Sequence, residues 1–100
     1  MTIAASISVN VPNGIAQVSE FIIGDEVRVC MTRRSIISGK ISSMVLNTSL
    51  GKVTRYSNEY QQHYIQDFFP ELDADEREFI LSGIKASEWD QMSGGEDDEV

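Results

Sequence analysis

The sequence predicts an α+β fold, in which an antiparallel β-meander of about four strands precedes two or three short helices. In the first half, apolar and polar residues alternate with a period of two between Gly-containing turns. In the second half, apolar residues recur at helical spacing and proline or capping residues bound the segments.

The composition suits a single folded unit. The chain has 100 residues, of which 41% are hydrophobic and 24% charged, which provides one modest core and argues against global disorder. We expect one domain over residues 1–92, with a β-rich half at 1–56 and a helical half at 57–92. Residues 93–100 are small and acidic and are expected to form a flexible tail.

The first strands form the best-defined local prediction. Val9 and Val11 alternate with polar neighbours, a pattern typical of a half-buried strand. Asn13-Gly14 follows, and this pair favours a two-residue type I′ turn because both turn residues need positive φ. With these residues as the loop, Val9 is expected to lie opposite Val18.

Two further turns complete the expected meander. Gly24-Asp25 favours a type II′ turn, which takes Gly at its first position, and Ser38-Gly39 is a third candidate. For residues 32–57 the sequence does not decide between strand and loop, because this segment begins with a polar run.

The helices follow from capping signals. Asn58 with Gln61 resembles a capping box and predicts a helix over 58–69, which Pro70 ends.

Asp73 with Glu76 predicts the next helix, for which Gly83 is a suitable C-cap, and a last short helix is expected from Ser87. The expected core comprises Ile7, Val9, Val18, Val29 and Ile41 from the sheet and Tyr64, Phe68, Phe79 and Ile84 from the helices.

Charge is unevenly distributed between the halves. Residues 1–56 hold six bases and three acids, a net +3, whereas residues 57–100 hold two bases and thirteen acids, a net −11. The basic residues either form a phosphate-facing patch or attract the acidic helices to the sheet, and the second interpretation is favoured. The candidates for nucleic-acid binding are Arg33, Arg34, Lys40, Lys52 and Arg55.

The acidic helical half is the favoured partner-binding surface. Most aromatic residues there have helical spacing and are expected in the core, but a tryptophan on a short terminal helix is typical of interface anchors. The candidates for partner binding are Glu76, Glu78, Trp89 and Met92.

No catalytic or metal site is evident. Cys30 and His63 are the single cysteine and histidine, which excludes an internal disulfide and a structural zinc cluster of about four ligands. On the expected helix His63 would lie between Glu59 and Asp67, where a solvated histidine is the favoured interpretation. The first basic residue is Arg28 and no apolar run approaches a membrane span, so neither a signal peptide nor a membrane segment is expected.

One stretch resembles a known group of proteins. Residues 69–90 contain Phe-Pro, Glu-Arg-Glu-Phe, Gly-Ile and Trp-Asp in this order, and a Ser-Gly turn precedes them. This pattern, over about residues 35–92, is similar to small uncharacterised bacteriophage proteins. Ser35 stands where that group has a cysteine, and residues 1–31 have no counterpart. The resemblance implies a phage or phage-like origin, in the host cytoplasm or the virion, and supplies no functional residue.

These observations lead to three hypotheses. We expect a small non-catalytic phage accessory protein that binds a host or phage protein through its acidic helical half. The first alternative is a virion structural protein that self-assembles through N-terminal strands such as 3–11, since an exposed strand can extend a neighbouring sheet. The second is a small nucleic-acid binder that uses the basic sheet face. No cofactor, metal or membrane partner is expected, and an enzyme is the least favoured class.

Overall fold

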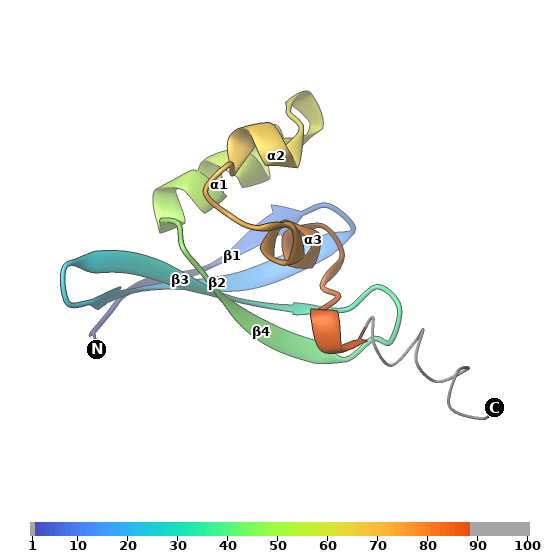
Figure 1. Cartoon of the computed structure of the whole chain (residues 1–100), viewed down its shortest axis with the longest axis horizontal. Helices are drawn as coiled ribbons and strands as arrows, with labels where there is room; N and C mark the ends of the chain where they lie inside the picture. Colours follow the sequence, from blue (N-terminus) through green and yellow to red (C-terminus); the bar gives the residue numbers. More distant parts are fainter. Residues whose placement is uncertain (1, 89–100) are drawn as a thin grey trace.

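The first half of the chain forms an antiparallel sheet. The computed structural model describes residues 2–88 and contains four strands in the order β1-β2-β3-β4. Figure 1 shows the helices that follow on one side of this sheet, so the predicted α+β meander is confirmed. The strands span Thr2–Val11 (β1), Gly14–Ile23 (β2), Glu26–Arg34 (β3) and Ile41–Leu46 (β4).

The β1–β2 hairpin forms, but its register differs from the predicted one. Val9 lies opposite Ala16 instead of Val18, and the loop is Pro12-Asn13. Asn13 has φ 69°, which fits the second central position of a type II turn after proline. Had the loop begun at Asn13, Pro12 would have to donate a hydrogen bond in the adjoining strand pair, which proline cannot do. The shift of two residues leaves each side chain on its predicted face.

The other two connections differ in length. Ile23 pairs with Glu26, so Gly24 and Asp25 join β2 to β3 directly, and the φ of 60° at Gly24 fits the predicted turn. The β3–β4 connection is longer and leaves residues 35–40 outside the strands. Residues 32–57, which the sequence assigned neither to strand nor to loop, therefore contain the end of β3, a loop, β4 and the start of a helix.

The first helix was not predicted. Helix α1 (Leu50–Glu59) begins after Ser49, whose side chain accepts a hydrogen bond from the backbone N–H of Lys52 at 3.2 Å. Asn58 lies inside this helix, so the capping box expected at Asn58 is wrong. The signal was weak because Val53 and Tyr56 are the only buried residues that α1 contributes.

The expected continuous helix over 58–69 is also replaced by shorter pieces. The end of α1 is followed by the 3₁₀ helix η1 (Tyr60–Gln62) and the four-residue helix α2 (Ile65–Phe68). Between them the backbone is extended at His63, which breaks the helical path.

The next helix agrees with its capping signals. In α3 (Ala74–Ser82) the Asp73 carboxylate accepts from the backbone N–H of Glu76 at 2.8 Å, and Glu76 accepts from the N–H of Asp73 at 2.9 Å. Gly83 ends the helix with φ 76° and donates its N–H to the carbonyl of Phe79. Residues 86–88 are helical, and the rest of the expected last helix lies outside the described residues.

The core lies between the sheet and the helices, with three corrections to its predicted members. Ile41 is 63% exposed because it is on the opposite face of the sheet, and Tyr64 is 73% exposed between η1 and α2. Ile7 faces the helices but remains 36% exposed because β1 is an edge strand. The largest fully buried side chains are Phe69, Phe79, Met31, Leu46, Ile80, Val18, Val29 and Val53.

Candidate functional site

The basic residues predicted to bind nucleic acid do not gather into one patch. Arg33 ends up only 3% exposed on β3, whereas Arg34 and Lys40 are exposed at the β3–β4 loop. Lys52 and Arg55 lie on α1, which is separated from that loop in Figure 1. Each of the two is paired with a glutamate: Lys52 Nζ lies 2.9 Å from Glu71, and Arg55 Nε lies 3.6 Å from Glu59.

Arg33 has a buried guanidinium that is bound by backbone carbonyls. Alternation along β3 places it beside Met31 on the helix-covered face. Its Nη1 donates to the carbonyls of Ile80 at 2.6 Å and Pro12 at 3.1 Å, and its Nε donates to that of Arg34 at 3.3 Å. Burial lowers the pKa of the guanidinium, but arginine stays protonated in proteins. None of the ion pairs formed within residues 2–88 includes Arg33.

These contacts fix the C-terminus of α3. A helix leaves its last four carbonyls without intrahelical partners, and a cation there is favourable. In α3 all four accept a hydrogen bond, one from the C-cap residue and three from other segments. The donors are Gly83 N–H to Phe79 at 2.8 Å, Arg33 to Ile80 at 2.6 Å, Asn13 Nδ2 to Leu81 at 3.0 Å and Ile36 N–H to Ser82 at 2.9 Å.

A hollow of about 340 Å³ opens beside this junction. Its lining residues come from the β1–β2 turn and the start of β2 on one side, and from the end of β3 and the β3–β4 loop on the other. These two connections lie at the same end of the antiparallel sheet (Figure 1). Both arginines line the hollow, and none of its lining residues within residues 2–88 is acidic. These are Asn13, Gly14, Ile15, Arg33, Arg34, Ser35 and Ile36.

The acidic residues predicted to bind a partner already have roles within α3. Glu76 completes the capping box, and Glu78 Oε2 accepts a hydrogen bond from Ser82 Oγ at 2.7 Å. Both residues are partly buried. Trp89 and Met92 lie outside the described residues, so partner binding by this set stays a prediction.

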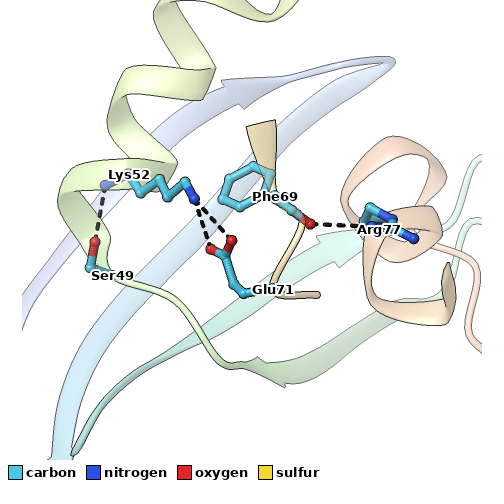
Figure 2. A network of polar contacts seen from close by, with 5 residues as sticks. All are labelled: Ser49, Lys52, Phe69, Glu71 and Arg77. Carbon is cyan, nitrogen blue, oxygen red and sulfur yellow. Dashed lines mark hydrogen bonds and ion pairs between the residues drawn. The ribbon is translucent and has the colours of Figure 1, made fainter. Parts of the chain in front are cut away.

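A second polar network connects α1 to the segment before α3 (Figure 2). Lys52 Nζ donates to both carboxylate oxygens of Glu71, at 2.9 and 3.1 Å, and lies 5.4 Å from the ring centroid of Phe69. Arg77 Nη1 donates to the Phe69 carbonyl at 3.3 Å. Burial raises the pKa of Glu71, but the hydrogen bond from Lys52, a backbone hydrogen bond and the Lys52 charge outweigh it, so the pKa is lowered.

The structure does not bring the cysteine and the histidine together. Cys30 is half-buried on the face of the sheet that carries no helix, opposite Val45 of β4. His63 lies in the helical layer, with Nε2 3.0 Å from Glu59 Oε1. Within residues 2–88 no cluster of His, Cys, Asp and Glu is arranged to hold a metal ion, and no helix is long and apolar enough to cross a membrane.

The two edges of the sheet differ in how they are covered. In β1, the ten residues include no charged side chain and no proline. No hydrogen bond among the described residues reaches the outer side of its backbone. Strand β4 also lacks charged residues and proline, but it has only six residues, and Lys85 Nζ donates to its Ser43 carbonyl at 2.9 Å. The free edge of β1 is thus a second candidate functional feature.

Two features of these sites were missed from the sequence. The burial of Arg33 could have been inferred from strand parity, because it follows Val29 and Met31 at alternate positions. The Lys52–Glu71 pair had no such signal, because it depends on the placement of α1.

Comparison with known proteins adds no relative: the chain matches no protein-family model, no curated protein and no solved structure.

Proposed function

We propose that this chain is a non-catalytic assembly protein, and that it pairs with a second copy of itself along the free edge of β1. The contrast between the two sheet edges is the observation that supports this function. An uncovered edge strand offers a row of unpaired N–H and C=O groups, which can hydrogen-bond to a strand of another chain.

The composition of β1 favours pairing between identical strands. The chain carries a net charge of −8, so two copies repel each other overall. Because β1 is uncharged, two copies can meet along it without placing like charges opposite one another. Two copies of one strand pair antiparallel about a two-fold axis, the commonest symmetry of homodimers.

The side chains of β1 suggest the register. The irregularity between Ile3 and Ala5 limits regular pairing to the residues that follow it. A pair centred on Ser8 would place Ile7 against Val9 of the second copy. The added strand would then cover Ile7, which is 36% exposed at the sheet edge although it faces the helix side. Burial of this apolar area favours the dimer.

Analytical ultracentrifugation of the full chain tests the proposal. We expect a reversible dimer at protein concentrations up to about 1 mM, which corresponds to a binding free energy of about −4 kcal/mol. Ser8→Lys should abolish the dimer, because it would place two ammonium groups next to each other at the two-fold axis.

The matched control is Gln17→Lys. Gln17 is exposed and lies directly opposite Ser8 on β2, so it receives the same charge on the same face of the sheet but away from the edge. Its dimer should persist. A wild-type chain that stays monomeric, or a Ser8→Lys variant that still dimerises, would overturn the proposal. The resemblance to phage proteins makes the virion the setting in which to look for this assembly by mass spectrometry of purified particles.

A further inference from the structure

Two exposed isoleucines flank an arginine in one cross-strand row of the sheet. Ile41 of β4 lies opposite Arg34 of β3. On the other side of β3, Ala16 of β2 lies opposite Arg33. The antiparallel register therefore places Ile15 beside Arg34. Because side chains alternate along a strand, Ile15, Arg34 and Ile41 share the face without helices, and we call them the isoleucine row. Both isoleucines are more than half exposed.

The β3–β4 loop, which follows Arg34 directly, extends this apolar surface. It contains Ile36 and Ile37, and both are more than half exposed. A cluster of large exposed apolar side chains is typical of an interaction surface. The charge here is positive, because Arg34 and Lys40 lie at this end of the sheet and residues 27–58 contain no Asp or Glu. The surface therefore fits a segment that combines apolar and acidic side chains.

The described part of the chain ends next to this surface (Figure 1). Ser35 Oγ donates to Glu88 Oε2 at 3.0 Å, and residues of the β3–β4 loop, the start of β4 and the segment 85–88 line one hollow of about 130 Å³. The row spans β4 to β2, about 10 Å at the usual spacing of neighbouring strands. The twelve residues after Glu88 can extend over about 40 Å. They are therefore long enough to pass the edge of β4 and reach the whole row.

We propose that residues 89–100 dock on the isoleucine row of the same chain, through Trp89 and Met92. This segment has the composition that the surface fits, since it contains these two large apolar residues, five acidic residues and no basic residue. Burial of the tryptophan against isoleucine favours docking, and Arg34 and Lys40 attract the acidic residues. Because the segment is tethered beside the row, its effective concentration there is far above that of a second copy.

The opposite end of the sheet also has exposed apolar side chains but does not fit this segment. Ile22, Ile23 and Val27 lie there next to the β2–β3 turn. That turn brings Asp25 and Glu26, which repel an acidic segment. It also lies at the end of the sheet away from the β3–β4 loop, where the described chain ends. Charge and reach therefore both favour the isoleucine row.

Fluorescence of the full chain tests the docking, because Trp89 is its single tryptophan. We expect acrylamide to quench Trp89 at least twofold less efficiently in the native chain than in the chain unfolded by urea. Ile41→Ser should remove this protection while the sheet stays folded, because Ile41 is exposed. Ile23→Ser is the matched control: it removes an exposed isoleucine from the same face at the other end of β2, and the protection should persist.

A reciprocal measurement leaves the sheet unchanged. Trp89→Ala should shift the backbone amide signals of Ile15 and Ile41 in ¹⁵N NMR spectra and leave that of Ile23 in place.

Three results would overturn the proposal. The first is a native Trp89 that acrylamide quenches as readily as in the unfolded chain. The second is the same quenching in Ile41→Ser and Ile23→Ser. The third is protection that appears only when the protein concentration is raised, which would mean that a second copy supplies the segment. Ser8→Lys, which tests the β1 dimer, should keep the protection, so the two proposals can fail separately.

Discussion

The helices α1 and α3 pack on the same face of the sheet, but they are held there by different kinds of contact. The end of α3 is fixed through its backbone carbonyls, which accept from the Arg33 and Asn13 side chains and from backbone N–H groups. There Gly83 approaches the carbonyl of Arg34 so closely that an added Cβ would clash with that oxygen. In α1, side chains make the contacts: the Tyr56 ring lies 5.2 Å from the rings of both Phe68 and Phe69.

This difference has a consequence for tolerance to substitution. Aromatic packing depends on volume and loses stability in proportion to the atoms removed. The contact between Gly83 and the Arg34 carbonyl involves no side chain, so it is disrupted when atoms are added to the glycine. We therefore expect α1 to be sensitive to truncation and α3 to be sensitive to the smallest enlargement at its C-terminus.

Truncation of Phe69 should have the largest effect. Phe69 is fully buried between α1 and the sheet and contacts both Tyr56 and Phe68. Phe69→Ala should lower the free energy of unfolding by about 3–5 kcal/mol, measured by urea denaturation. Tyr64→Ala is the control, because Tyr64 is 73% exposed, and it should change stability by less than about 0.5 kcal/mol. Similar losses in the two variants would contradict the aromatic account of α1.

Enlargement of Gly83 should have the next largest effect. Gly83→Ala places a methyl group against the Arg34 carbonyl and also forces alanine to adopt a φ of 76°. Gly39→Ala isolates the second cost, since Gly39 has the same φ of 76° and no atom within 4 Å of an added Cβ. We expect Gly39→Ala to destabilise by about 1 kcal/mol and Gly83→Ala by about 3 kcal/mol. Equal losses of stability in the two variants would show that the backbone around Gly83 can move to accept a methyl group. The expected difference between α3 and α1 in tolerance to substitution would then not exist.

The same comparison explains how far the sequence could predict the structure. Asp73, Glu76 and Gly83 lie within or next to α3, so their capping signals are local and the helix was predicted correctly. For α1, the N-cap at Ser49 was hidden by a stronger but misleading capping pattern at Asn58. Secondary structure was thus predictable where neighbours in sequence set it.

The site was less predictable because it depends on tertiary contacts. Arg33 and Arg34 are adjacent in sequence, yet one is buried and the other exposed because successive strand residues point to opposite faces. The expected basic patch did not anticipate that the Arg33 guanidinium would hold the end of α3, 47 residues away in sequence. Nothing local to either segment encodes that contact.

The Lys52–Glu71 ion pair should have the smallest effect, and it depends on pH. Because the pKa of Glu71 is lower in the folded chain than in the unfolded chain, its contribution is present above the unfolded value of about 4.3. It is lost as the pH falls through the lower folded pKa. Glu71→Gln should therefore cost about 0.5 kcal/mol at pH 7, a small value because both side chains are about one-third exposed. Thermal unfolding of the wild-type chain and of Glu71→Gln, measured from pH 7 to pH 2.5, should show the difference in stability disappearing in acid.

The control is Asp67→Asn, at an exposed carboxylate with no ion pair among the described residues. Its stability difference from the wild type should not change in this way with pH. A Glu71→Gln deficit that persists at pH 2.5 would show that the charge of Glu71 is not the source of the difference.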